Sequence, residues 1–334
     1  KNIQTIAGNN VHIIDRNHLI LKIFEQHAKS HESKKQVKLA LLEYMLPRLT
    51  GLWTHLERQM GGIGTRGGPG EKQIEIDKRI IRKDITKLKK DLVNIQKHRK
   101  TQIKKRDSIF KVSLVGYTNA GKTSLMKEIS GYTGTIKNQL FATLDTTTRK
   151  VKSENNYKYI LSDTVGFIRD LPHDLVASFK STLSEVSSAD LLIKVLDGTS
   201  SELEVHNETI SKVLKELSAE KIPLITVVNK VDQINNNDNF NKMRRELEDP
   251  IFISALNHLN LHLLEKAIEK FIDSIQISKV FKIPYNKIAI IDLIYKLLNV
   301  VTRRDGYKFV YIEAKGKEKD IAIIEKSINI EKHP

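Results

Sequence analysis

The segment from Gly116 to Ser124, G-Y-T-N-A-G-K-T-S, constrains the fold of this chain more than any other. It fits the phosphate-loop pattern G-x-x-x-x-G-K-[ST], which requires a strand before it and a helix after it. Residues 110–115 are an apolar run typical of a strand, and residues 125–129 are typical of a helix. Such a turn directs backbone N–H groups and a helix N-terminus at one point, which attracts phosphate. We expect Lys122 to reach the β- and γ-phosphates and Thr123 to bind Mg²⁺.

Three more motifs follow this loop, each after an apolar run that predicts a strand. Asp163 to Gly166, D-T-V-G, can supply a carboxylate near Mg²⁺ and a glycine N–H near the γ-phosphate. Asn229 to Asp232, N-K-V-D, is more specific, because its aspartate can accept hydrogen bonds from N1–H and the 2-amino group of guanine. Ser254-Ala255 offers a small turn over the base. Open α/β sheets place ligands at the carboxyl ends of their strands, so the ordered set predicts a guanine-nucleotide site.

A threonine that closes over the nucleotide is expected in the segment from Phe141 to Thr148. Thr143 is the first choice, because it stands between two apolar residues, and Thr147 is the alternative. Position 167 is phenylalanine, where Ras-like enzymes carry the glutamine that orients the attacking water. We therefore expect slow basal hydrolysis that a partner, an ion or another loop accelerates.

The expected site residues have three kinds of role. The catalytic residues would be Lys122, Thr143 and Gly166, and the metal ligands would be Thr123, Thr143 and Asp163. Asn119 could also help to hold a monovalent cation beside the phosphates, and a simple turn-forming role fits it equally well. The nucleotide would contact residues from all the motifs: Gly116, Tyr117, Thr118, Asn119, Ala120, Gly121, Lys122, Thr123, Ser124, Phe141, Ala142, Thr143, Leu144, Asp145, Asp163, Thr164, Val165, Gly166, Asn229, Lys230, Val231, Asp232, Ser254 and Ala255.

Two longer stretches resemble the HflX family of ribosome-associated GTPases. They are residues 163–176, D-T-V-G-F-I-R-D-L-P-H-D-L-V, and residues 46–71, which lie outside the generic GTPase core. The resemblance runs from about Asp15 to about Ser274. It implies GTP or GDP and Mg²⁺ as ligands, and the large ribosomal subunit, with its rRNA near the peptidyl-transferase centre, as partner. It also implies splitting or rescue of stalled ribosomes.

The chain departs from that family pattern at two places. Thr123 stands where the family commonly has serine, which exchanges one hydroxyl for another. Thr146-Thr147 stands where the family commonly has Pro-Thr, so we expect a less restricted backbone there.

Charge and composition narrow the possible partners and compartments. The 334 residues carry a formal net charge of +16, which indicates a polyanionic partner. The segment from Glu71 to Arg106 holds 14 Lys or Arg against 5 Asp or Glu and no Phe, Trp or Tyr, so it offers phosphate contact rather than base stacking. The chain has no cysteine, which fits a reducing compartment, and no apolar run approaches the roughly 20 residues that span a bilayer. We expect a cytoplasmic monomer and, because the chain opens on Lys1, a missing upstream part.

The region before the phosphate loop predicts an antiparallel helical hairpin at residues 28–108, with a glycine-rich loop at residues 57–71. Its first helix would end near Leu46 and its second would run over residues 71–106, where apolar residues alternate by four and three. Glycines this dense add nothing to a core, so we favour a contact surface over a linker, with rRNA as the partner that the family implies. The residues that define these features are Arg58, Arg66 and Lys72 beside the loop and Ile81, Ile85, Leu88, Leu92 and Ile95 in the seam.

The predicted fold class is therefore α/β, with a P-loop GTPase domain at residues 109–275. A partial α/β unit at residues 1–27, with a strand at 11–14 and a helix after Asp15, would precede the hairpin. A small α+β domain at residues 280–334 would follow the GTPase domain. It would contain a strand at 281–285, a helix at 288–301 and a strand at 307–314.

The sequence also allows other functions and sites, which fewer of its features support. A GTP-gated rRNA-binding assembly factor with incidental turnover is the main alternative, and a small GTPase that signals to a protein leaves the basic hairpin unexplained. His27 and His31, four apart on an expected helix, have only their spacing to favour a metal site. His173, after D-T-V-G, fits packing at a helix start better than catalysis.

Overall fold

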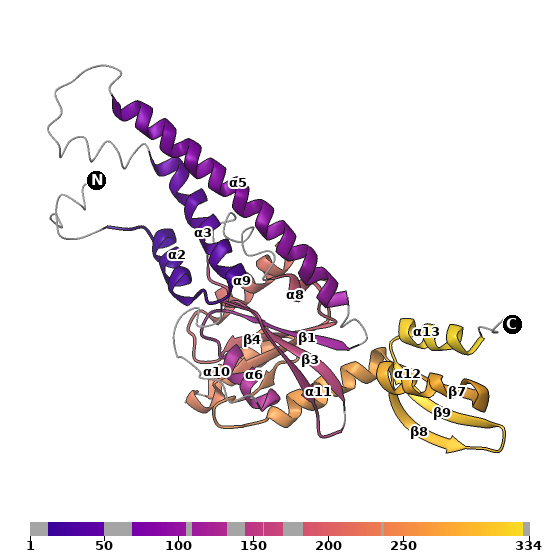
Figure 1. The fold of residues 1–334 in the computed structure, drawn as a ribbon. Helices are drawn as coiled ribbons and strands as arrows, with labels where there is room; N and C mark the ends of the chain where they lie inside the picture. Colours follow the sequence, from indigo (N-terminus) through magenta and orange to yellow (C-terminus); the bar gives the residue numbers. More distant parts are fainter. Residues whose placement is uncertain are drawn as a thin grey trace.

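The computed structural model describes residues 13–49, 69–104, 109–131, 144–155, 157–169, 183–234 and 237–329. A helical arm, a mixed sheet with helices on both faces and a small antiparallel sheet follow one another along the chain (Figure 1). The predicted α/β class, with a helical region before the main sheet and a small C-terminal α+β unit after it, is confirmed.

The arm packs along the seam that the sequence predicts. Its elements are α2 (Arg16–His27), α3 (His31–Met45), a 3-10 turn (Leu46–Arg48) and α5 (Pro69–Lys104). Leu39 of α3 is buried with Ile85, Leu88 and Leu92 of α5, and Ile81 and Ile95 pack against them. Figure 1 shows α3 and α5 side by side, and two ion pairs, Lys35–Asp91 and Lys89–Glu43, join them. Residues 57–68 of the predicted glycine loop lie outside the described residues, and residues 69–71 begin α5.

The main sheet has the strand order β2-β3-β1-β4-β5-β6. Only β2 is antiparallel to its neighbour, so the other five strands end at the same edge. The strands are β1 (Phe110–Gly116), β2 (Thr147–Lys152), β3 (Lys158–Asp163), β4 (Leu191–Asp197), β5 (Leu224–Asn229) and β6 (Ile251–Phe252). The central strands are almost wholly buried, as expected for parallel strands with helices on both faces.

Two hydrophobic clusters cover the faces of this sheet. One holds Leu125 of α6 (Lys122–Ser130) and Ile268 of α11 (Leu261–Ile275). The other holds residues of α9 (Leu203–Glu216) and α10 (Asn237–Glu246), and also Phe24 of α2 and Val37 of α3. The arm is therefore rooted in the core of the main domain. Two short elements, α8 (Ser184–Ser187) and a 3-10 turn (Val231–Gln233), complete this part of the chain.

The C-terminal unit is a three-stranded antiparallel sheet of order β7-β9-β8. Two helices and the sheet share a core that includes Ile294 and Ile312. Lys315 and Lys317 form ion pairs with Asp273 and Asp190 of the main domain. The elements are β7 (Ile277–Pro284), a 3-10 turn (Tyr285–Lys287), α12 (Ala289–Leu297), β8 (Asn299–Asp305), β9 (Phe309–Gly316) and α13 (Glu318–Asn329).

Several element predictions were incomplete or wrong. The helix expected at residues 288–301 ends at Leu297, and residues 299–301 begin β8 instead. Strand β2 and helix α13 were not predicted. Of the strand expected at residues 11–14, residues 11–12 lie outside the described residues, and Ile13 and Ile14 are in neither helix nor strand.

Candidate nucleotide site

The phosphate loop joins the end of β1 to the start of α6 at the centre of the sheet. Two of its glycines are required by close packing. A Cβ on Gly116 would lie 2.4 Å from the carbonyl oxygen of Val195 on β4. Gly121 has a φ of 93°, and a Cβ there would lie 2.1 Å from Asn229 Nδ2. The loop is thus pressed against β4 and against the N-K-V-D motif, which no larger residue would allow.

Lys122 is the first residue of α6 and is almost fully buried. Its Nζ donates hydrogen bonds to the carbonyl oxygens of Gly116, at 3.1 Å, and Tyr117, at 2.9 Å. Burial lowers the pKa of Lys122 to about 8, and the charge of Asp163 opposes that shift. The ammonium group is therefore held inside the loop, in a place where added negative charge would favour its protonated form.

The two described residues that were predicted to bind metal lie together. Thr123 Oγ1 donates a 2.6 Å hydrogen bond to Asp163 Oδ2 at the carboxyl end of β3. A hydroxyl and a carboxylate oxygen are ligands that Mg²⁺ accepts, and Mg²⁺ usually keeps several waters instead of an all-protein cage. No group of three His, Cys, Asp or Glu that could hold a metal occurs within the described ranges. The third predicted ligand, Thr143, lies outside them, as do Phe141 and Ala142.

The D-T-V-G segment runs against the phosphate loop. Phe167 N donates to Gly116 O at 3.0 Å, and Thr118 N donates to Phe167 O at 2.8 Å. A Cβ on Gly166 would lie 2.7 Å from Thr118 Cα and 3.1 Å from Lys122 Nζ, so this glycine permits the close approach. Val165 is buried, and the Thr164 hydroxyl donates to Leu114 O at 2.7 Å.

Phe167 occupies the position at which Ras-like enzymes carry a water-orienting glutamine. Its side chain is only 3% exposed and belongs to the cluster that contains Phe24 of α2 and Leu144. An aromatic ring packed in this way has no group that could orient a water. This position therefore belongs to the hydrophobic core that also holds the base of the arm.

Asn229 connects three of the predicted motifs. Its Nδ2 donates to Ala120 O of the phosphate loop at 3.0 Å, and its Oδ1 accepts from Ala255 N at 3.0 Å. The next residue, Lys230, has a φ of 65° and pairs through Nζ with Asp197 Oδ2 at 2.7 Å. One side-chain amide therefore fixes the distance between the phosphate end and the expected base end of the site.

The remaining residues of the base end lie around this amide. Val231 and Asp232 are half-buried in the 3-10 turn that follows Lys230. Ser254 is buried, and its hydroxyl accepts a hydrogen bond from Asn257 N at 3.1 Å. Asp232 is the residue expected to read the guanine edge, which stays a prediction.

Asp145 links the predicted switch segment to the arm. Its Oδ2 accepts hydrogen bonds from the backbone N–H groups of Lys29 and Ser30, both at 3.1 Å, and its Oδ1 accepts from the Ser30 hydroxyl. Burial acts to raise the pKa of Asp145, but hydrogen bonds from Ser30, Ser33 and Lys29 outweigh it and lower the pKa. Its carboxylate thus sits at the N-terminus of α3, and its predicted contact with the nucleotide is not tested.

Tyr117 of the phosphate loop has contacts that the sequence does not reveal. The Tyr117 ring stacks on His206 of α9, with 3.7 Å between ring centroids, and its hydroxyl accepts from Arg169 N at 3.0 Å. Asn119 is exposed and has a φ of 62°, which suits a turn-forming asparagine. Ser124 lies in the first turn of α6.

Comparison with known proteins gives the site its family. A family model described as the GTP-binding GTPase middle region matches residues 27–106, and one described as a 50S ribosome-binding GTPase matches residues 111–230. The GTPase HflX of Flavobacterium psychrophilum is 43% identical over 310 residues, which are 86% of this chain and 73% of the relative. This chain belongs to the HflX family of GTPases.

Other HflX-type relatives agree with this. The GTPase HflX of Caldanaerobacter subterraneus subsp. tengcongensis is 44% identical over 297 residues, 86% of this chain and 65% of the relative. The chain thus spans 73% and 65% of the length of these two curated relatives. The solved complex of SsGBP with GDP has a TM-score of 0.50 and 34% identity, over 77% of this chain and 72% of that one. The resemblance to HflX proteins drawn from the sequence is confirmed.

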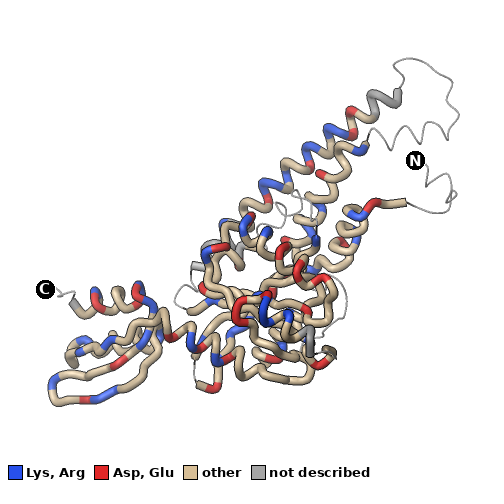
Figure 2. The backbone as a smooth tube through the Cα atoms, turned by 180° about the vertical axis from the view of Figure 1, so that it is seen from behind, with Lys and Arg blue, Asp and Glu red and all other residues tan. Residues whose placement is uncertain are grey.

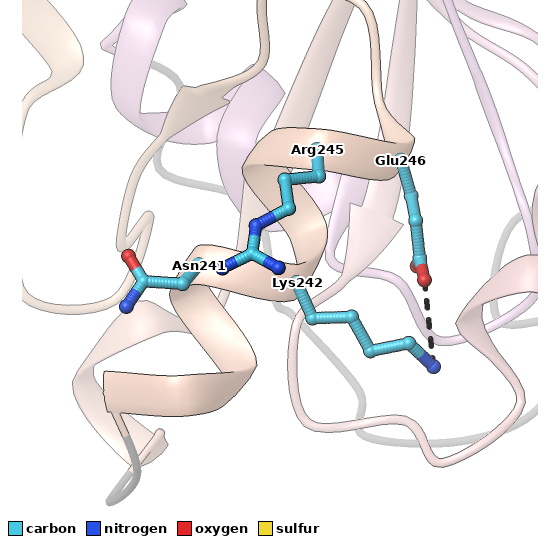
Figure 3. Close-up of a pocket in the computed structure, with 4 residues that line it drawn as sticks. All are labelled: Asn241, Lys242, Arg245 and Glu246. Carbon is cyan, nitrogen blue, oxygen red and sulfur yellow. Dashed lines mark ion pairs between the residues drawn. The ribbon is translucent and has the colours of Figure 1, made fainter.

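Other places that could have held a site in this HflX-family chain are less well formed. A surface hollow of about 330 Å³ lies on α10. Figure 3 shows the residues that line it, Asn241, Lys242, Arg245 and Glu246, and the ion pair between Lys242 and Glu246. His27 ends α2 and His31 begins α3, so the expected single helix is wrong for that pair. His173 lies outside the described residues.

No helix in the described part of the chain is long and apolar enough to cross a membrane.

Proposed function

We propose that this chain binds GTP with Mg²⁺ at the carboxyl edge of the main sheet and hydrolyses it while bound to the large ribosomal subunit, where it splits or rescues stalled ribosomes. The observation that carries the nucleotide assignment is Asn229, whose amide joins the phosphate loop to the Ser254-Ala255 turn. A motif that recognises guanine is useful only if it is held at a fixed distance from the phosphate site, and this amide provides that distance.

The residues present fit Mg²⁺ as a partner of the phosphates. Thr123 and Asp163 would hold the ion, directly or through water, and Lys122 would neutralise the β- and γ-phosphates. When bound, Mg²⁺ would neutralise negative charge that develops on the phosphate oxygens. Gly166 would offer its backbone N–H to the γ-phosphate. Thr143 and the Asn119 cation site belong to this proposal as untested parts.

The ribosomal part of the proposal rests on the arm and on the family. The matching family model is described as a 50S ribosome-binding GTPase. Figure 2 shows Lys and Arg along α5. Arg82, Lys83, Lys87 and Lys90 of this helix are exposed. Cations in a row on a long helix suit the phosphates of rRNA. We also propose that residues 28–108 act as the ribosome-contacting unit, residues 109–275 as the GTPase domain and residues 280–334 as an accessory domain.

The link between these units would pass through the root of the arm. Phe167, which follows D-T-V-G, shares a hydrophobic cluster with Phe24 of α2, and Asp145, which follows the predicted switch threonine, accepts a hydrogen bond from Ser30 N at the start of α3. If either segment moves when the γ-phosphate leaves, its packing against the arm would therefore change. The arrangement supports a switch that is read by the ribosome-contacting unit.

The test is GTP turnover by the purified chain, alone and with large ribosomal subunits. Because Phe167 cannot orient water, we expect a slow basal rate that the subunit raises at least about tenfold. Lys122→Ala is the control that should remove turnover under both conditions. Firm subunit binding without stimulation would instead favour the GTP-gated rRNA-binding assembly factor, in which turnover is incidental.

A further inference from the structure

The C-terminal sheet leaves one of its faces open. Helices α12 and α13 pack on the other face, where Val310, Ile312 and Ala314 of β9 are fully buried (Figure 1). Side chains alternate along a strand, so the residues between these three point to the opposite, outward face. Tyr311 is 41% exposed, and Val280, on the neighbouring β7, is 62% exposed. No described element of the chain covers this outward face.

The open face places an aromatic residue between two cations. Tyr311 lies on β9, the central strand, and is paired in register with Lys282 of β7 on one side and Arg304 of β8 on the other. Phe309 is two residues before Tyr311 and so lies on the same face, with Lys282 Nζ 4.2 Å from its ring centroid.

The two cations beside Tyr311 differ from other cations of this sheet, because Lys315, also on the outward side of β9, pairs with Asp273 of α11. On the helix-covered face, Lys279 pairs with Glu325 and Arg303 pairs with Asp305. Lys282 and Arg304 occupy the same two strands but point to the open face, and neither has an ion pair with a described residue. The face therefore presents positive charge on both sides of its aromatic centre.

The acidic residue of the open face, Glu313, has polar partners. Its carboxylate accepts hydrogen bonds from the hydroxyls of Ser278 and Thr302, each at 3.3 Å. Its register neighbours on β7 and β8 are Val280 and Thr302. A ribose 2′-hydroxyl can both donate and accept a hydrogen bond. It could therefore bond to the Glu313 carboxylate and its hydroxyl partners while a base lies on Tyr311, two residues away.

We propose that this open face, formed by Lys282, Arg304, Phe309, Tyr311 and Glu313, binds single-stranded RNA. A base stacks on Tyr311, and phosphate oxygens contact Lys282 and Arg304. A peptide that adds a strand would pair with a sheet edge, whereas these residues centre on the middle of the face. A duplex hides its bases from such a surface. The site is separate from the nucleotide site and from the arm, so it goes beyond the proposed function.

The experiment measures binding of the full 334-residue chain with GDP to a fluorescein-labelled, unstructured 12-nucleotide RNA by anisotropy. Removal of one stacking ring costs about tenfold in affinity, so Tyr311→Leu should weaken binding by that factor. Tyr311→Phe keeps the ring and should bind like the unmodified chain. An unchanged affinity for Tyr311→Leu, with an unchanged melting temperature, would overturn the proposal and leave the face to a protein partner.

Matched charge variants test the two flanks. Lys282→Gln and Arg304→Gln should each reduce the slope of log affinity against log salt by about 0.7. Lys279→Gln and Arg303→Gln make the same change on the same strands but on the covered face, and they should leave the slope unchanged. Equal effects on both faces would show that only overall charge matters, which contradicts the proposal.

Cross-linking separates this surface from the basic arm. RNA that carries 4-thiouridine should cross-link to the peptide that contains Phe309 and Tyr311, and Tyr311→Leu should lower that yield. Cross-links confined to α5 would overturn the assignment. DNA of the same sequence should bind several-fold more weakly, because it lacks the 2′-hydroxyl, and equal binding would contradict the choice of RNA.

Discussion

The two sheets of this molecule offer different surfaces to a ligand. The central strands of the main sheet are buried on both faces, so a ligand can reach them at their carboxyl ends, beside Gly121 and Asn229. The C-terminal sheet is buried on one face, and its other face carries Tyr311 and Lys282. A parallel sheet concentrates polar groups at one edge, whereas a half-covered antiparallel sheet spreads them over a surface. The edge of the main sheet therefore suits a compact nucleotide, whereas the face of the C-terminal sheet suits an extended polymer.

The largest expected effect concerns the edge of the main sheet. Lys122→Ala removes the buried cation that holds Gly116 O and Tyr117 O, so it should lower GTP affinity by about a hundredfold or more. A fluorescent GTP analogue measures this change. RNA binding on the open face should be unaffected, and a parallel loss of both would mean that the two sheets are not independent.

Next in size are substitutions on the two faces of β9. Ile312→Ala empties a site in the C-terminal core and should reduce the free energy of unfolding of this unit by about 2–4 kcal/mol. Tyr311→Leu, on the open face, should change it by less than about 0.5 kcal/mol. Urea unfolding followed by hydrogen exchange of residues 277–329 measures both. A large loss for Tyr311→Leu would mean that the open face is a structural surface.

Two glycines with positive φ give a sharper test of the crowded edge. Gly121→Ala adds a Cβ against Asn229 Nδ2 to a strained backbone and should destabilise the main domain by about 2 kcal/mol or more. Gly131, which ends α6 with a φ of 64°, has no atom within 4 Å of the added Cβ. Gly131→Ala should therefore cost only about 1 kcal/mol. Equal costs in thermal unfolding would show that crowding at Asn229 does not matter.

The smallest effect concerns the root of the arm. Asp145→Asn should destabilise the contact with α3 by about 1 kcal/mol at neutral pH, because a charged acceptor at a helix N-terminus is lost. The pKa of Asp145 is lowered from its usual 3.8, so its contribution is complete above that value and disappears as the pH falls through the folded-state pKa. The difference in urea midpoint between the two chains should then be constant above about pH 5 and shrink below pH 4. A difference that does not shrink between about pH 5 and the lowest pH at which both chains still fold would contradict this account.

How far the sequence predicts the fold depends on how evenly each element is buried. Residues 191–197, L-L-I-K-V-L-D, are mostly apolar, and β4, which they form, is buried on both faces. Strand β2 reads T-T-R-K-V-K and buries only Val151, so it has no apolar signal. The apolar run continues from α12 through Leu298 to Val301, and a short apolar run does not distinguish a helix from a strand. The helix was therefore predicted too long.

The site was predicted from motifs that act locally, and its missing parts arise from tertiary contacts. The pairs Thr123–Asp163 and Lys122 with its loop follow from motif spacing. The stack of Tyr117 on His206 joins the phosphate loop to α9, and no local pattern gives it. The partner of Lys230 is Asp197, the last residue of β4, and its place after an apolar run was the one available signal.

Asn229 has a consequence for the thermodynamics of binding. Because its two amide atoms already hold the phosphate loop and the Ala255 turn, the two ends of the site behave as one cooperative unit. A nucleotide that arrives at either end meets the other end in position and loses no free energy in arranging it. The guanine and phosphate parts of a nucleotide should therefore bind as two linked groups, as in a chelate. The nucleotide should gain affinity that neither guanosine nor free phosphate has alone.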